Sequence, residues 1–456
     1  MAQFASPRPV VDRLSSEDLT TLLTDRGPAP MQIGAVVRLE SPAGADRADL
    51  LGVIRRRLLT IPRFRQRVLV PPPLCGRPLW VDDADFEVDR HLRTVTCLAP
   101  GATDDLLALA ADLVATRLAR DRPLWSATLV TGLDDGSCAL VVVLHHVLTD
   151  GIGGLAVLAA LVDEAAADAP PVDDGQPAPS WKRLLLDAAA HRARRLRDLR
   201  RAPRALREVL SALRASRVAA PRTSLNRPTG RRRRAHRVEL DLAELHDAAR
   251  RHGATINDLL LTAVAGTLGR TAASRGERLP HLVISVPVAQ RSDASLDDLG
   301  NRVGVVPVTV PTTGHPLQRL TETARASRTA RASTLEASAV LGAVFRLLAR
   351  LRVFQWVIDR QRLVTTFVTN LHGPSEELRL AGQRITALVP ISVVAGNVTV
   401  AFAALSYAGR LGVTVIVDPD VGPDGPAVVA ALREELDALV ALPAADVASS
   451  LAGNNI

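Results

Sequence analysis

Runs of apolar residues divide the chain into segments whose patterns predict alternating strands and helices. The clearest is an unbroken, valine-rich run over 139–144, preceded by a turn-like stretch at 134–136. A short continuous run of this kind is typical of a strand buried on both faces. Residues 153–162 follow as an apolar helix. The segment between them therefore lies where a buried strand ends and a turn begins.

Similar patterns predict further elements on both sides of this segment. Upstream, apolar stretches at 33–37 and 68–70 accompany helix candidates at 46–59 and 103–119, and 127–130 is a strand candidate. Downstream, the pattern predicts strands at 281–288, 303–310, 398–406 and 411–417, and helices at 339–358 and 424–442. Pro307 argues that the 303–310 strand lies at an edge or a bulge, because proline cannot donate to a ladder.

One stretch is long enough to cross a bilayer. Residues 385–409 carry no charged side chain, and a spanning helix needs about 20 residues. The stretch contains Pro390, Gly396 and Asn397 and is rich in valine and threonine. We therefore predict two buried strands with a turn near Gly396, and no membrane helix.

Length and composition point to a globular protein of two domains. A chain of 456 residues exceeds one ordinary core, and 47% hydrophobic with 23% charged residues excludes a disordered protein. The three cysteines are scattered without CxxC spacing, which indicates a reduced, cytoplasmic protein and argues against a zinc site. The amino-terminal residues show no signal peptide. We predict a first domain over 1–168, a proline-rich connector and basic arm over 169–236, and a second domain over 237–456.

Positive charge is concentrated in one arm. Residues 181–237 hold nineteen basic and three acidic residues, whereas the whole chain has a net charge of +8. Leucines recur near helical spacing in this arm, with arginines between them. The pattern is typical of a helix that lies on an anionic lipid surface. A crossover helix that bridges the two domains is the alternative. We do not expect nucleic-acid binding, because no aromatic residues are interleaved and no recognition motif is present.

Two adjacent histidines at the strand end are the strongest chemical signal. His145 and His146 point to opposite faces if the strand continues, so they are expected to do different jobs. A free imidazole has a pKa of roughly 6.5, which suits a general base. Asp150 is placed to bind an imidazole or to pair with an arginine, and Gly151 permits a positive φ or a close backbone approach. A metal pair, or two histidines satisfied at a strand end, are the alternatives.

The segment His145 to Gly151 matches the pattern HHxxxDG, and it resembles the acyl-CoA-dependent acyltransferase superfamily. Further matches follow the order of one branch, the bacterial wax ester synthase/diacylglycerol acyltransferase family. They are Leu14–Asp18 and Pro30–Ala35 near the start, Pro123-Leu124-Trp125, Asn257-Asp258, Pro287–Arg291 with Gly300-Asn301, and Thr369–Pro374. The chain departs from the family at Ala289, where serine is common, and at Leu371-His372, where Val-Pro is usual. The opening also lacks the family's aromatic residue.

The resemblance implies an α/β fold of two chloramphenicol acetyltransferase-like domains, with mixed sheets flanked by helices and the active site in a tunnel between them. It also implies that His146 is the general base and later protonates the leaving CoA thiolate. Asp150 is expected to shape the loop, paired with Arg291, and Asn257 is a candidate near the oxyanion. Neither an acylated side chain nor a metal or other cofactor is expected, because acyl-CoA is itself a substrate.

Two of these residues also have ordinary structural explanations. Trp125 is either a wall of the acyl or acceptor channel or a core tryptophan, and the core is favoured because tryptophans are highly buried on average. Thr255 and Asp258 have the spacing of a capping box, which leaves Asn257 as a helix-start residue or as a group aimed at the active site. Asn370, in the Thr369–Pro374 match, is expected to bind substrate.

The resemblance therefore predicts a long-chain acyl-CoA-dependent O-acyltransferase that esterifies diacylglycerol or a fatty alcohol to give triacylglycerol or wax ester. The alternatives are a specialised metabolite or carrier-bound acceptor on the same fold, and a lipid-surface binding protein without catalysis. The expected partners are acyl-CoA and a lipid alcohol. Residues 181–237 are expected either to contact the inner membrane or lipid droplets peripherally or only to bridge the two domains. The sequence does not define an oligomeric state.

Overall fold

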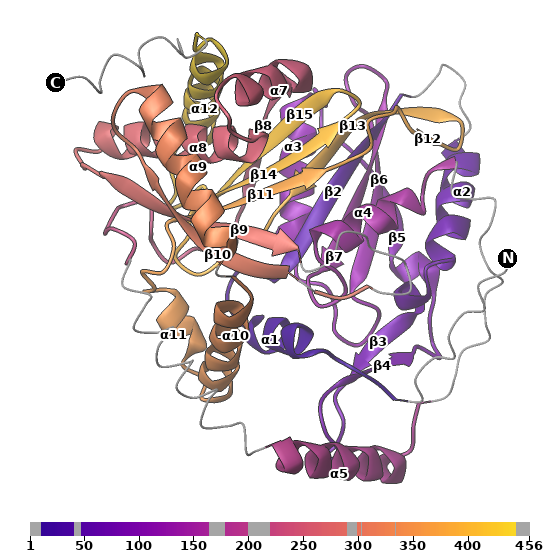
Figure 1. The fold of residues 1–456 in the computed structure, drawn as a ribbon. Helices are drawn as coiled ribbons and strands as arrows, with labels where there is room; N and C mark the ends of the chain where they lie inside the picture. Colours follow the sequence, from indigo (N-terminus) through magenta and orange to yellow (C-terminus); the bar gives the residue numbers. More distant parts are fainter. Residues whose placement is uncertain are drawn as a thin grey trace, which may run out of the picture.

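The computed structural model of the chain describes residues 11–40, 47–163, 178–198, 219–289, 299–301, 303–332 and 334–443. It contains two six-stranded mixed sheets that lie side by side and are flanked by helices (Figure 1). The predicted α/β architecture with a sheet in each half is therefore confirmed.

The two large sheets are built from strands that are far apart in the sequence. The first has the order β12 (Arg379–Leu380), β13 (Gln383–Ile391), β2 (Gln32–Leu39), β7 (Cys138–His145), β6 (Trp125–Thr131) and β5 (Leu92–Thr96). The second has the order β10 (Val303–Pro311), β9 (His281–Ala289), β11 (Thr366–His372), β14 (Val400–Tyr407), β15 (Arg410–Val417) and β8 (Arg234–Asp241). Strands β12 and β13 come from the second half of the chain yet extend the first sheet. The first sheet therefore contains strands from both halves of the chain.

Helices pack against the faces of the sheets, and α3 lies between the two sheets. The first half of the chain supplies α1 (Ser16–Thr24), α2 (Arg47–Leu59), α3 (Thr103–Ala115), α4 (Gly151–Ala159) and α5 (Trp181–Asp198). The second half supplies α7 (Leu242–Arg251), α8 (Ile256–Ser274), α9 (Pro316–Ala332), α10 (Thr334–Arg350), α11 (Phe354–Ile358) and α12 (Gly425–Val440). A small third sheet, β1 (Asp12–Arg13), β4 (Leu79–Asp82) and β3 (Gln66–Leu69), lies beside α5.

Strand β7 is buried on both faces, as its apolar run predicts. Leu140 and Val142 face the core under α2 and α4, whereas Val141 and Val143 face a second core. That second core also contains buried residues of α3 and of the second sheet, Ala403 among them. Helix α3 therefore packs between the two sheets, each of which forms one lobe of the protein. Strand β7 ends within this contact between the lobes.

The segment 385–409 forms two strands, as predicted. Strand β13 pairs antiparallel with β2 in the first sheet, and β14 pairs with β11 and β15 in the second. Gly396 has a φ of 65°, so the chain turns between the two strands. The charge-free segment thus crosses from one lobe to the other. No helix within the described residues has the length and apolar character needed to cross a membrane.

The predicted single helix over 339–358 is wrong in one respect. The structure has two helices, α10 and α11, separated at Leu351–Val353. Arg352 lies in the left-handed region with a φ of 62°, and this conformation ends a helix. The edge position predicted for 303–310 from Pro307 is confirmed, because β10 is the outer strand of its sheet.

Candidate active site

His145 is a buried residue with both ring nitrogens engaged. The Val147 backbone N–H donates to its Nδ1 at 3.0 Å, and its Nε2 lies 3.1 Å from Asp25 Oδ2. Because Nδ1 accepts a hydrogen bond, the neutral ring carries its proton on Nε2 and donates it to Asp25. Neither nitrogen is left for a metal or for a substrate, so the metal-pair interpretation does not fit this residue.

Asp25 is the centre of a buried charge cluster. Arg117 and Arg120 each approach its Oδ2 at 2.6 Å, and its Oδ1 accepts the Met31 N–H at 3.0 Å. Burial alone would raise the pKa of Asp25, but the His145 hydrogen bond and the two arginines hold that pKa well below its ordinary value. The carboxylate is therefore charged throughout the neutral range.

His146 differs from its neighbour. Its backbone N–H donates to Met31 O at 2.8 Å, and its side chain is half-buried. Its Nδ1 is buried and has no hydrogen-bond partner among the described residues. Burial lowers the pKa of His146 below the usual histidine value, against the opposing negative charge of Asp150. The ring is thus a neutral imidazole at neutral pH, as a proton acceptor must be.

Asp150 and Gly151 join this turn to α4. Asp150 is fully buried and is the N-cap of α4, where its Oδ1 accepts the Gly153 N–H at 2.9 Å. A Cβ atom on Gly151 would lie 3.1 Å from a methyl group of Leu371, at the end of β11. Asp150 therefore fixes the start of the helix, and Gly151 permits the second lobe to pack closely against it. Arg291, the predicted partner of Asp150, lies outside the described residues.

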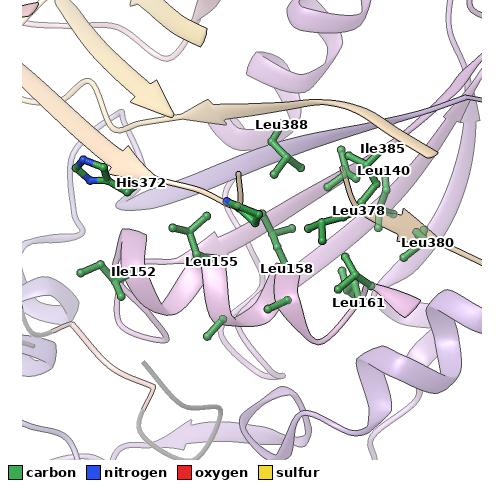
Figure 2. A pocket seen from close by; sticks show the side chains of 15 residues that line it. Leu140, Ile152, Leu155, Leu158, Leu161, His372, Leu378, Leu380, Ile385 and Leu388 are labelled. Atoms are coloured by element: carbon green, nitrogen blue, oxygen red, sulfur yellow. The ribbon is translucent and has the colours of Figure 1, made fainter. Parts of the chain in front are cut away.

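An apolar cavity of about 400 Å³ lies along α4. Its walls are aliphatic, from α4, from β2, β7 and β13 of the first sheet, and from the chain after β11 (Figure 2). Ile152 and His372 lie toward one end of the cavity, and Leu161 and Leu380 lie toward the other (Figure 2). The volume falls in the range of small-molecule sites. Since Ile152 is in the first turn of α4, the cavity starts close to the turn that carries His146.

Asn370 and His372 belong to the segment that reaches this cavity. Asn370 is half-buried in β11, opposite Ala404 of β14, two residues before the cavity-lining His372. A substrate contact for Asn370 stays a prediction. His372, where the family usually has proline, places an exposed imidazole at the cavity's edge.

Trp125 is a core residue, and its predicted role in a channel wall needs correction. It is 1% exposed, and its ring stacks on Phe64 and on His91 with centroid distances of 4.6 Å each. Its Nε1–H donates to Phe64 O at 2.8 Å. Both faces and the polar edge of the ring are therefore used inside the protein, and none is left for a substrate.

Asn257 lies at the start of α8, in the second lobe. Thr255 is the N-cap, and Asp258 completes a capping box by accepting the Thr255 N–H at 3.0 Å. Asn257 itself is half-buried, and within the described part of the chain no contact joins it to the turn that holds His146. Asn257 therefore keeps its two interpretations, a helix-start residue or a group near the oxyanion, and substitution separates them.

Several segments matched by motif meet around the active-site turn. Gln32 pairs with His145 across β2 and β7, and its side-chain amide donates to Val114 O and Thr116 O at the end of α3. Asn301 donates its backbone N–H to Asp18 at 2.9 Å. The opening motif thus contacts both the histidine turn and the Gly300-Asn301 match.

The functional residue that the sequence did not reveal is Asp25. It lies between two matched segments, in the stretch Thr24-Asp25-Arg26, and it has no motif of its own. Its partner His145 is 120 residues away. In the sequence Asp25 is one acidic residue between two matched segments, and such a signal is too common to single out one residue.

Comparison with known protein families identifies two successive matches. Residues 14–260 match the model of the wax ester synthase/diacylglycerol acyltransferase catalytic domain, and residues 299–440 match the WS/DGAT C-terminal domain. The chain is also 31% identical over 427 residues to a probable diacylglycerol O-acyltransferase of Mycobacterium tuberculosis strain H37Rv, and the match covers 90% of this chain and 92% of the relative.

Solved structures show the same fold. The wax ester synthase/diacylglycerol acyltransferase from Marinobacter aquaeolei VT8 aligns with a TM-score of 0.69 at 21% identity, over 94% of this chain and 98% of that one. The first condensation domain of the calcium-dependent antibiotic synthetase aligns with a TM-score of 0.63 at 18% identity, over 97% and 98% of the two chains. At these identities the two structures support only the fold, which is the two-lobed fold predicted here.

Proposed function

The chain belongs to the wax ester synthase/diacylglycerol acyltransferase family and is an acyltransferase, and we propose that it transfers a long acyl chain from acyl-CoA to the hydroxyl of diacylglycerol or a fatty alcohol. The product is then triacylglycerol or a wax ester. One observation carries the proposal. A neutral imidazole lies in the turn just before a helix that walls an aliphatic cavity.

In the proposed reaction His146 is the general base. Its Nδ1 is fully buried, so we assign Nε2 to the substrate. As Nε2 removes the hydroxyl proton, the alcohol oxygen attacks the thioester carbonyl carbon and a tetrahedral oxyanion forms. The carbon–sulfur bond then breaks, and the imidazolium returns the proton to the CoA thiolate. Acyl transfer is complete without a bond between acyl group and protein.

The cavity along α4 is proposed to hold one long alkyl chain. Its lining is aliphatic except for His372 at the edge. Each methylene group buried in such an environment contributes about 0.8 kcal/mol. This gain grows with chain length, so a long-chain substrate is favoured over a short one.

The test is product analysis with purified protein. Palmitoyl-CoA is supplied with diacylglycerol or with a fatty alcohol, and lipid products are separated by thin-layer chromatography. We expect ester product, and we expect His146→Ala to lower the rate about 100-fold or more, because a positioned base contributes about 10²–10⁴-fold. His246→Ala, at an exposed position of α7, is the matched control. Near-normal turnover by His146→Ala would reject the base, and ester formed only on other acceptors would reject the lipid alcohol.

We further propose that α5 contacts an anionic lipid surface. Leu184 and Ala188 are buried against the rest of the protein, and Arg13 pairs with Asp187 at 2.6 Å. On the outer side, Trp181 is 58% and Leu186 is 71% exposed. Exposed basic residues accompany them, namely Lys182, Arg183 and Arg192. The helix is therefore docked on one side and presents an apolar and basic surface on the other. The leucines of the predicted arm from Leu199 to Leu213 lie outside the described residues.

Vesicle sedimentation tests this contact. Trp181→Ser with Leu186→Ser is expected to weaken binding to phosphatidylglycerol vesicles, with little change for neutral phosphatidylcholine vesicles. Leu98→Ser, at a position 85% exposed in the first lobe, is the control. If the double variant sediments like the unmodified protein, α5 is not the contact.

A further inference from the structure

The backbone on both sides of the His146 side chain is fixed by hydrogen bonds. On the amino-terminal side, the His146 N–H donates to Met31 O at 2.8 Å. On the carboxyl-terminal side, the Val147 N–H donates to the Nδ1 of His145 at 3.0 Å. The orientation of the His146 ring therefore depends on Met31 and on the His145 imidazole.

Both of these groups are held by the same carboxylate. Asp25 Oδ1 accepts the Met31 N–H at 3.0 Å, and Asp25 Oδ2 accepts the Nε2–H of His145 at 3.1 Å. Asp25 and His145 are 2% exposed, so water does not compete for these bonds. Arg117 and Arg120 neutralise the buried charge from the outer side.

We infer that Asp25 is a positioning residue for the proposed general base, acting through Met31 and His145 on the two peptide groups that flank His146. Asp25 touches no reacting atom in this scheme. The inference rests on the proposed function, because the role that it explains is that of His146.

An amide cannot replace this carboxylate. Both oxygens of Asp25 accept hydrogen bonds, whereas asparagine has one acceptor and one donor group. If the amide oxygen faces Met31, the amide NH₂ faces the Nε2–H of His145. His145 must then move its proton to Nδ1, and Nδ1 no longer accepts the Val147 N–H. If the amide is turned round, the Met31 bond is lost instead. In either case one hydrogen-bonded connection is lost, the one through Met31 or the one through His145.

Steady-state kinetics of Asp25→Asn is the first measurement. We expect kcat to fall about 100-fold, since a misplacement of about 1 Å at a catalytic group has an effect of this size. The KM for palmitoyl-CoA should change little, because Asp25 lies away from the cavity lining. Asp418→Asn is the matched control, since Asp418 is a fully buried aspartate in the second lobe whose carboxylate pairs with Arg233 at 3.3 Å.

A double-mutant cycle separates positioning from general destabilisation. If Asp25 acts largely through His145, Asp25→Asn should have a much smaller effect on kcat when His145→Ala is already present. Full multiplication of the two effects, or an unchanged kcat in folded Asp25→Asn, would overturn the inference.

Nitrogen-15 NMR of the histidine rings tests the arrangement in the unmodified protein, so it is decisive even if Asp25→Asn fails to fold. We expect His145 to carry its proton on Nε2 and to leave Nδ1 unprotonated as the acceptor of the Val147 N–H. A proton on Nδ1 would overturn the inference. Activity in His146→Ala would reject the proposed base itself, and the NMR result would still report on the Asp25 contacts.

Discussion

The starts of α4 and α8 each carry a motif match, and the turns that precede the two helices differ in burial. Each helix begins with an aspartate that satisfies backbone N–H groups, Asp150 in α4 and Asp258 in α8. Before α4, the turn residues from Val147 to Asp150 are fully buried between the lobes. Before α8, Gly253 and Thr255 are exposed. A shared helix-start aspartate is therefore a structural feature. The turn before α8 also contains a histidine, His252, whereas His146 precedes the helix that walls the aliphatic cavity.

The largest contrast is expected between Asp150→Ala and Asp258→Ala. Each substitution removes a capping carboxylate, which lowers the free energy of unfolding by about 1 kcal/mol. Asp150→Ala should also lower kcat about 100-fold, because the turn that orients His146 runs directly into the capped helix. Asp258→Ala should leave kcat within a few-fold of the unmodified value.

Thermal unfolding and steady-state kinetics on the same samples distinguish the two effects. Equal losses of kcat in the two variants would show that activity follows stability alone, and the contrast between the helix starts would disappear.

A substitution at Gly151 tests how closely the start of α4 packs against the second lobe. In Gly151→Ala the new Cβ would lie 3.1 Å from Leu371, so the second lobe or α4 must move. Overpacking of this kind lowers stability by about 1–3 kcal/mol. Gly154→Ala, one turn along the same helix, is the control, because the nearest atom to its Cβ is 4.0 Å away.

The combination of Gly151→Ala with Leu371→Ala tests the cause. Relative to Leu371→Ala alone, the double variant should recover most of the stability that Gly151→Ala loses, measured by thermal unfolding. Without recovery, the glycine is required for some reason other than the close approach of β11.

The pH profile should show the imidazole directly. Burial lowers the pKa of His146, and the base must be neutral, so kcat/KM should rise through an acid limb centred below 6.5, the ordinary histidine value. The sign of the stability effect follows. The unfolded chain binds a proton near 6.5 and the folded chain does not, so the stability is full above that pH and falls below it.

The variant His146→Gln tests whether His146 causes the pH dependence of stability. In this variant the loss of stability between about pH 6.5 and 5 should be smaller than in the unmodified protein. An acid limb at or above 6.5 in the unmodified enzyme would contradict the lowered pKa.

The sequence predicted the local elements of the site well, because they depend on local patterns. The buried run gave β7, and the glycine-containing apolar stretch gave α4. The capping residues of α8 were likewise predictable from spacing. Pairing over long distances was not predictable, because alternation of apolar residues fixes which face is buried and not which strand is the neighbour.

Two features show this limit. The pattern predicts β13 as a strand, but its position beside β2 joins segments from opposite ends of the chain, as in the pair Ile385 and Leu39. The bond between Asp25 and His145 depends on a buried charge cluster assembled from the end of α1, the segment after α3 and the end of β7. Trp125 shows the reverse case, since a residue in a functional motif proved to be ordinary core.

The smallest effect is expected at Asn257. Its half-buried side chain lies beside a capping box that Thr255 and Asp258 complete without it. Asn257→Ala should therefore change the free energy of unfolding by no more than about 0.5 kcal/mol, as surface substitutions usually do. Single-turnover rates with palmitoyl-CoA and a fatty alcohol should stay within a few-fold of the unmodified enzyme. If the rate instead fell about 100-fold with stability intact, the amide would be acting on the oxyanion, since one such donor contributes about 10²–10³-fold. The start of α8 would then be a second half of the active site rather than a structural counterpart of α4.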